Sequence, residues 1–135
     1  LFEDKGVIMI SKEEVEHNFA CLKKQAQEVF GFEVTYVDVD EHGIVDMEQL
    51  RNSLRNDTIL CSIMYVNNEV GSVQPIAEIK KLIRKYPNCF LHVDCVQALG
   101  KLPVDLQDID LATMSAHKIY GLKGIGMLIK KENIK

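Results

Sequence analysis

Short apolar segments that alternate with helical patterns constrain the fold of this chain more than any other feature. Three of these segments are largely apolar from end to end, at residues 7–10, 58–66 and 89–93. A strand that alternates apolar and polar residues buries one face, whereas a continuously apolar strand is covered on both faces, as in parallel sheets. The sequence therefore predicts an α/β fold of three layers, with helices on both faces of a mostly parallel sheet.

The segments between these strands carry the pattern of amphipathic helices. Three helices are expected, at residues 11–30, 46–54 and 75–86. Asp46 is a favourable cap for the second helix, Pro75 suits the first turn of the third, and Pro87 ends it. Further strands are expected at residues 33–39, 111–114 and 125–129.

Composition narrows the class of protein but leaves its chemistry open. The chain has 135 residues, enough for one domain, and its formal net charge of −4 argues against a general nucleic-acid binder. No apolar run reaches the length of a membrane span. The four cysteines include no Cys-x-x-Cys pair, so no metal site is expected, and free thiols in a reducing, cytoplasmic compartment are favoured. The chain begins with Leu1 rather than Met, which leads us to expect an internal piece of a longer protein.

Polar side chains collect where three of the predicted strands end. Because the carboxyl ends of parallel strands meet at the edge where α/β sheets bind ligands, we expect these side chains to line one crevice. His17, early in the first predicted helix, belongs to the same edge. Taken singly, each residue also has an ordinary interpretation as a turn former, a helix cap or a surface residue. In chain order the three clusters are Asn67, Asn68 and Glu69; Asp94 and Gln97; and Ser115, His117 and Lys118.

The residue types in these clusters match the needs of one cofactor, pyridoxal phosphate. Lys118 can form a Schiff base with an aldehyde, and the Asp94 carboxylate can hold a protonated pyridine nitrogen. Gln97 or Asn68 can donate to the phenolic oxygen. Hydroxyl and imidazole groups can hold the phosphate, and a flat histidine ring can stack on the pyridine ring.

The sequence closely resembles the cysteine desulfurases, in the class V aminotransferase group of fold-type I pyridoxal-phosphate enzymes. The resemblance implies that residues 1–135 are the central part of the cofactor-binding large domain and that the small C-terminal domain is absent. Four stretches carry it, in the family's order and at nearly its spacing: Glu16-His17, Thr58 to Gly71 (TILCSIMYVNNEVG), His92 to Asp105 (HVDCVQALGKLPVD) and Ser115 to Gly126 (SAHKIYGLKGIG).

The resemblance implies a reaction and a set of partners. Members of this family take sulfur from L-cysteine, which leaves L-alanine and a persulfide on an enzyme cysteine. The sulfur then goes to iron–sulfur cluster assembly and tRNA thiolation. The expected protein is a cytoplasmic homodimer that works with an iron–sulfur scaffold or another sulfur-acceptor protein, with no nucleic acid or membrane as a partner. In the family, the partner subunit also completes the phosphate site.

The resemblance also assigns roles to individual residues. The catalytic roles fall to Lys118, the Schiff-base lysine, and to His17, which would stack on the ring and move protons. The other cofactor contacts fall on Asn68 near the phenolic oxygen, Asp94 at the pyridine nitrogen, Gln97 at the phenolic oxygen, and Ser115 and His117 at the phosphate.

The sequence also departs from the family pattern. Leu122 stands where the family usually has proline, and Ala116 where glycine is common. No cysteine has the serine- and glycine-rich context of the family's persulfide cysteine, and the substrate-binding arginine is missing. We therefore expect the isolated chain to be inactive. Three alternatives stay open: another class V aminotransferase or lyase, a non-catalytic remnant of a split gene, and a plain α/β domain without cofactor.

Overall fold

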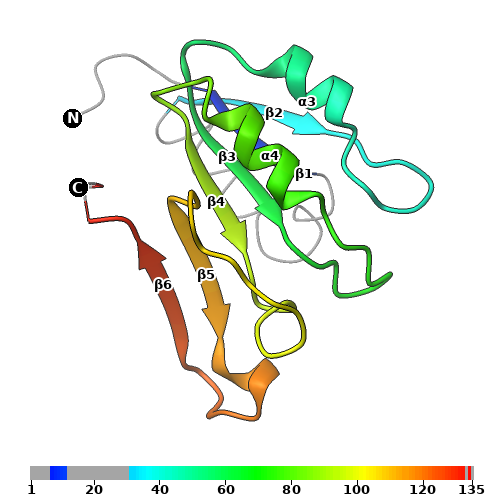
Figure 1. Ribbon diagram of the computed structural model, residues 1–135, viewed down its shortest axis with the longest axis vertical. Coiled ribbons are helices and arrows are strands. Elements are labelled where there is room, and N and C mark those ends of the chain that lie inside the picture. The colour runs from blue at the N-terminus through cyan, green and yellow to red at the C-terminus, as the bar shows by residue number, and fades with distance from the viewer. Residues whose placement is uncertain (1–6, 12–30, 133, 135) are drawn as a thin grey trace.

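The computed structural model describes residues 7–11, 31–132 and 134. Within them six strands form one sheet in the order β2-β1-β3-β4-β5-β6 (Figure 1). Strands β1 to β5 pair in parallel and β6 runs antiparallel to β5, so the predicted mostly parallel sheet is confirmed. The strands are β1 (Val7–Ser11), β2 (Glu33–Val37), β3 (Thr58–Met64), β4 (Phe90–Asp94), β5 (Leu111–Ser115) and β6 (Gly126–Lys130).

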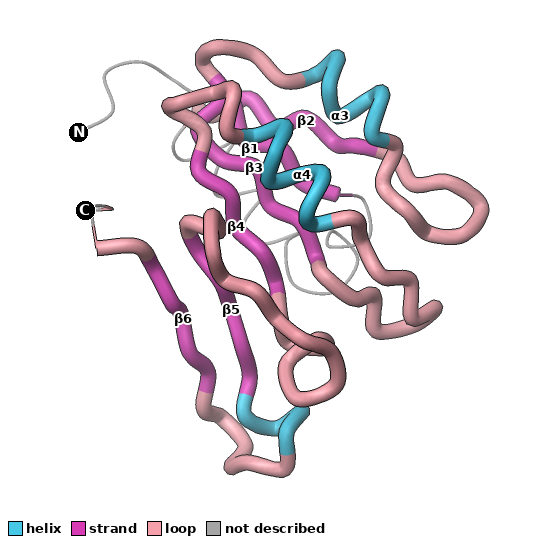
Figure 2. Tube along the Cα trace, viewed as in Figure 1, coloured by secondary structure: helices cyan, strands magenta, loops and turns pink. Residues whose placement is uncertain are grey.

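Figure 2 shows the two described α-helices, α3 (Met47–Ser53) and α4 (Ile76–Ile83). Both share one hydrophobic core with the sheet. Side chains of a strand alternate between its faces, so every second residue of β3, β4 and β5 points toward this core. Ser11, where the first predicted helix begins, is the last residue of β1, and the rest of that predicted helix lies outside the described residues, as does the second helical layer. The buried residues of α4 and of these three strands are Ile76, Ile79, Leu82, Ile83, Cys61, Ile63, Leu91, Val93, Ala112 and Met114.

Three predicted elements extend further along the chain than the observed ones. Helix α4 ends at Ile83 because the N–H groups of Lys85 and Tyr86 donate to carbonyls three residues back, which forms tight turns instead of a further helical turn. Strand β3 ends at Met64, and Val66 instead makes an isolated antiparallel bridge with residue 73. Strand β2 ends at residue 37 for the same reason, since residue 39 bridges residue 45. These bridges turn the chain away from the sheet at its carboxyl edge.

The predicted Asp46 cap is confirmed, and its contribution to the stability of α3 can be tested. Asp46 Oδ1 accepts hydrogen bonds of 2.9 Å from the N–H groups of Glu48 and Gln49, which have no helical partner. Asp46→Ala should cost about 1 kcal/mol, which corresponds to roughly fivefold faster exchange of the α3 amide hydrogens. Hydrogen exchange followed by mass spectrometry measures this. Asp46→Asn retains an acceptor oxygen and should exchange like the parent protein; equal exchange in all three would contradict the cap.

Candidate functional site

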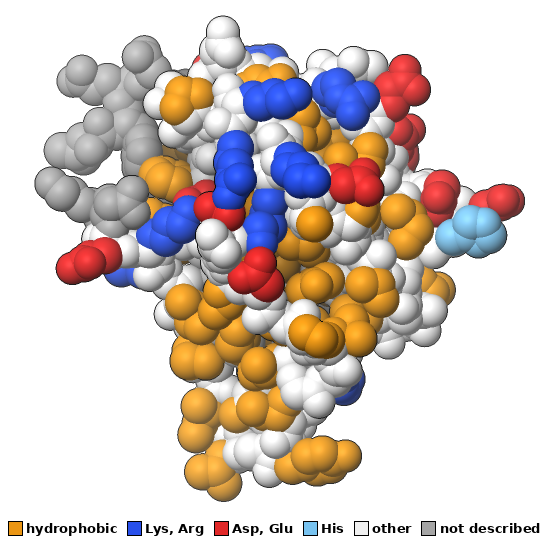
Figure 3. All heavy atoms as spheres, viewed as in Figure 1, with side chains coloured by type: hydrophobic (Ala, Val, Ile, Leu, Met, Phe, Trp, Pro, Cys, Tyr) orange, Lys and Arg blue, Asp and Glu red, His pale blue; other side chains and the backbone are white. Residues whose placement is uncertain are grey.

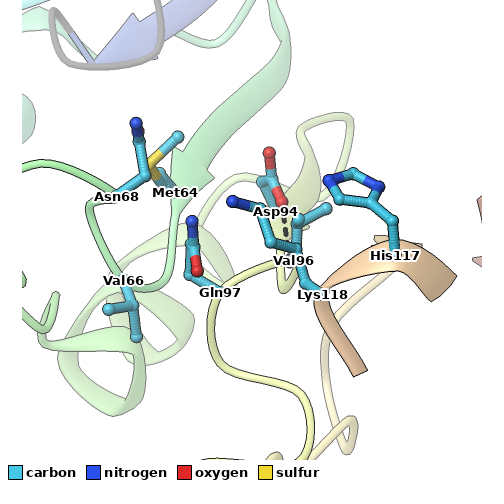
Figure 4. Close-up of a pocket in the computed structure, with 8 residues that line it drawn as sticks. All are labelled: Met64, Val66, Asn68, Asp94, Val96, Gln97, His117 and Lys118. Carbon is cyan, nitrogen blue, oxygen red and sulfur yellow. Dashed lines mark hydrogen bonds between the residues drawn. The ribbon is translucent and has the colours of Figure 1, made fainter. Parts of the chain in front are cut away.

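A pocket of about 310 Å³ opens at the carboxyl edge of the parallel strands (Figure 4). This volume lies at the small end of the range for small-molecule sites. The pocket lies where the segments after β3, after β4 and after β5 meet, as the positions of the polar clusters in the sequence predict. Its lining residues are Met64, Val66, Asn68, Asp94, Val96, Gln97, His117 and Lys118.

Asp94 is the last residue of β4, and its carboxylate is oriented by the turn that follows. Its Oδ1 accepts a 2.8 Å hydrogen bond from the N–H of Val96. Among the described residues, no lysine, arginine or histidine forms an ion pair with Asp94. Within the described part of the chain, the Asp94 carboxylate thus has no cation paired with it, which suits a cationic group on a ligand.

Gln97 follows Asp94 in the same turn and presents a hydrogen-bond donor. Its Oε1 accepts a 2.8 Å hydrogen bond from Lys101 Nζ, four residues further on. Because the amide oxygen is occupied in this way, the NH₂ group is left for a ligand, and this group can only donate. Gln97 thus offers a donor within the pocket that also contains the Asp94 carboxylate (Figure 4).

Lys118 enters the pocket from a short 3₁₀ helix, η3 (Ala116–Ile119), directly after β5. The loop that carries η3 is closed at its base by a 3.0 Å bond from Ala116 N–H to the carbonyl of Ile125. Tyr120 ends η3 in the left-handed conformation (φ 62°), which is costly for a residue other than glycine. Backbone strain of this kind is common at functional sites.

Two glycines let this loop pack tightly. A Cβ at Gly121 would lie 2.9 Å from Ala116 Cβ and 3.0 Å from its carbonyl oxygen, closer than a side chain tolerates. Gly100 has φ +76°, and a Cβ there would lie 3.2 Å from Ile119 Cγ2. The turn after β4 and η3 are therefore in contact outside the pocket, and this contact fixes the two segments that carry Asp94 and Lys118.

Ser115 and His117 form a pair beside Lys118. Ser115 Oγ and His117 Nδ1 are 2.6 Å apart. His117 lines the pocket, whereas Ser115 reaches it only through this hydrogen bond. A hydroxyl and an imidazole at the end of a strand can together donate to an anionic oxygen.

The remaining predicted site residues differ in their placement. Asn68 lines the pocket and is exposed. Its neighbour Asn67 is buried, and its Oδ1 accepts from the N–H groups of Glu69 and Val70, so Asn67 acts as a turn former. His17 lies outside the described residues.

The apolar part of the pocket was not predicted from the sequence. Met64, Val66 and Val96 lie among the polar lining residues. All three lie at or just beyond the ends of strands, so their positions in the sequence could have indicated that they line the pocket.

Within the described ranges, no three His, Cys, Asp or Glu side chains are arranged to hold a metal ion. None of the described helices is both long and apolar enough to traverse a bilayer.

Comparison with known protein families identifies the class of protein to which this fold and pocket belong. The model of the aminotransferase class-V family matches residues 1–135, so the chain belongs to that family.

The relatives that it matches carry a more specific name. The cysteine desulfurase IscS of Clostridium botulinum is 45% identical over 123 residues, and that of Neisseria gonorrhoeae is 48% identical over 129 residues. These alignments cover 90% and 94% of the chain but only 31% of each relative. The chain therefore spans about a third of the length of the curated relatives it matches.

Two solved structures share the fold. A NifS-like protein superimposes with a TM-score of 0.86 at 36% identity, covering 98% of this chain and 37% of that one. SspA, solved in complex with cysteine, superimposes with a TM-score of 0.81, also at 36% identity, and covers 94% and 36%.

The tight packing at Gly121 generates a second test. Gly121→Ala would push its Cβ into Ala116 and break the 2.8 Å bond from the Gly121 N–H to the Ala116 carbonyl. Overpacking of this kind costs about 1–3 kcal/mol, so the amides of η3 should exchange roughly tenfold faster or more. Gly126→Ala is the matched control, because its Cβ would meet Met114 O at an ordinary 3.5 Å. Similar exchange in the two variants would show that the loop is not tightly packed at Gly121.

Proposed function

We propose that this chain forms the cofactor pocket of a pyridoxal-phosphate-dependent cysteine desulfurase. One observation carries the proposal: an amine, a carboxylate and an amide donor, from Lys118, Asp94 and Gln97, converge in one pocket. These groups come from two different strand ends, so their convergence is a property of the fold. The relatives named cysteine desulfurase and the SspA complex with cysteine favour L-cysteine as the substrate.

The groups in the pocket fit pyridoxal phosphate. Lys118 supplies the primary amine for covalent attachment to its aldehyde carbon. Asp94 offers a carboxylate for the pyridine nitrogen, and Gln97 an NH₂ donor for the phenolic oxygen. The Ser115–His117 pair offers donors for the phosphate, and Asn68 a further donor at the rim. When bound, the cofactor withdraws electrons from the substrate's reacting carbons. His17 remains a proposed stacking and proton-transfer residue.

The proposed reaction needs a sulfur acceptor, and the three described cysteines do not suit this role. The sulfur of L-cysteine passes to a thiol of the enzyme: the C–S bond of the substrate and the S–H bond of the acceptor break, an S–S bond and a C–H bond form, and L-alanine is left. Cys61, Cys89 and Cys95 are buried, and burial raises the pKa of Cys89 to about 12 and that of Cys95 to about 11. A buried, protonated thiol is a poor nucleophile. Cys21 lies outside the described residues, and none of the four cysteines has the sequence context of the family's persulfide cysteine. We therefore propose that the isolated chain does not turn over cysteine.

A larger assembly would cover the apolar surface of η3, β6 and the loop between them (Figure 3). Exposed apolar groups of this extent typically mark a contact surface. We propose that the rest of the large domain and a second subunit cover it in a homodimer, which delivers sulfur to an iron–sulfur scaffold or another acceptor in the cytoplasm. Free buried thiols suit a reducing compartment. The exposed residues are Ile119, Tyr120, Leu122, Ile125, Met127 and Leu128.

The visible absorbance of the full-length protein after incubation with pyridoxal phosphate tests the cofactor proposal. The parent protein should gain a visible band, and Lys118→Ala should lose it because no amine is left to bind the aldehyde covalently. Lys81→Ala is a matched control, since this exposed lysine of α4 does not line the pocket and should leave the band in place. L-Alanine formation from L-cysteine then tests the substrate. A band without alanine formation would support another class V lyase or aminotransferase.

The position of the sulfur acceptor gives a separate prediction. Cys89→Ala and Cys95→Ala should each keep at least about half of the alanine formation of the full-length protein, because buried thiols of high pKa do not attack the substrate sulfur. Mass spectrometry should find the persulfide on neither residue. Loss of alanine formation with an intact visible band in either variant would identify that cysteine as the acceptor.

A further inference from the structure

A chain of hydrogen bonds crosses three strands directly beneath the pocket. His92 lies on β4, and its Nδ1 is 2.7 Å from Ser62 Oγ on β3. On its other side, His92 Nε2 is 3.1 Å from Thr113 Oγ1 on β5. The strand register places Ser62 directly opposite His92, and the side chains of paired residues point to the same face of the sheet.

This polar layer is buried in the central strands. Ser62 is 0% exposed and His92 is 8% exposed. Burying polar groups costs free energy unless they are hydrogen-bonded, and here both ring nitrogens have hydroxyl partners. The opposite face of the same strands is apolar, with Cys61, Ile63 and Leu91 packed in the core. The polar chain therefore lies on the other face of the sheet, between the apolar Leu60 and Leu111 at one end of the strands and the pocket at the other.

The polar chain leads to Asp94. Asp94 stands two residues after His92 on the same strand, so both side chains lie on one face. Thr113, which bonds His92, is the residue directly opposite Asp94 on β5. Burial lowers the pKa of His92, despite the neighbouring Asp94 charge, which acts in the other direction. A neutral imidazole donates at one nitrogen and accepts at the other, which matches a hydroxyl on each side.

We propose that the Ser62–His92–Thr113 chain is a positioning layer for Asp94, which fixes the carboxylate at the pocket floor without neutralising its charge. The proposal rests on the proposed function, because it assigns Asp94 to the pyridine nitrogen. His92 is here a positioning residue, since it acts through Asp94 and does not line the pocket. A cation at position 92 would compete with the ligand for Asp94, whereas a neutral, doubly bonded ring holds the strand ends in register and leaves the charge available.

Two variants with amide side chains test the two hydrogen bonds of His92 separately. The glutamine amide nitrogen takes a position close to that of histidine Nε2, and the asparagine amide nitrogen one close to that of Nδ1. His92→Gln should therefore keep the bond to Thr113, and His92→Asn the bond to Ser62. Because Thr113 is the direct neighbour of Asp94, His92→Gln should resemble the parent protein, and His92→Asn should resemble His92→Leu, which loses both bonds.

Two readouts in the full-length protein test the proposal with pyridoxal phosphate as the probe. His92→Leu, His92→Asn and Thr113→Val should weaken its Kd about tenfold, the effect of losing support for a charged hydrogen bond. They should also raise the midpoint pH of the visible band by roughly one unit. A less firmly held Asp94 would stabilise positive charge on the ring nitrogen less well, and the charge balance around Lys118 would shift toward the protonated form. Thr113→Ser should restore both values. The other titratable groups lining the pocket, Lys118 and His117, are the same in every variant.

Thr58→Val is the matched control. Thr58 is a buried hydroxyl at the opposite end of β3, where Oγ1 accepts from the Arg55 N–H. Its loss should lower the melting temperature of the apo protein without moving the midpoint pH. An unchanged Kd and midpoint in His92→Leu and Thr113→Val would overturn the proposal, as would equal changes in Thr58→Val. Absence of the visible band in the parent protein would instead remove the proposed function, and this proposal with it.

Discussion

The parallel pairing of β3, β4 and β5 is the constraint on which the rest of the structure depends. Its register sets Met64 opposite Asp94 and Asp94 opposite Thr113. Backbone bonds continue the pairing just beyond the strands, from Tyr65 N–H to the Asp94 carbonyl and from Cys95 N–H to the Thr113 carbonyl. A slip of one residue would turn Asp94 toward the core and a valine toward the pocket. The chemistry of the pocket is therefore a consequence of strand register.

Much of this arrangement could be predicted from the sequence because its causes are local. Apolar runs predict strands, Asp46 predicts a cap and Pro75 predicts a helix start, since each effect acts over a few residues. Polar residues at three strand ends predict a shared edge once the strands are known to be parallel. The direction of the Gln97 amide could not be predicted, because it depends on the Lys101 side chain reaching back across a turn. Nor could the left-handed Tyr120 or the Gly100–Ile119 contact, which depend on how separate segments pack.

In the central strands, residues on one face stabilise the fold through core packing, and the residues that form the pocket lie on the other face. Toward α4 the strands are apolar, and their contribution to folding comes from buried area. On the other face, beside apolar residues such as Leu60 and Leu111, they carry Asp94 and the hydrogen-bonded Ser62, His92 and Thr113. Because neighbouring residues of one strand point to different faces, a substitution such as Val93→Ala alters packing while Asp94 keeps its chemical surroundings. Stability and ligand recognition can therefore change independently within a single strand.

The contact between Gly100 and Ile119 has a mechanical consequence. It joins the turn after β4 to η3 at a point that no ligand in the pocket reaches, and packed contacts of this kind transmit displacement. A displacement of the turn after β4 is therefore passed to η3, so the segments that carry Asp94 and Lys118 are mechanically coupled.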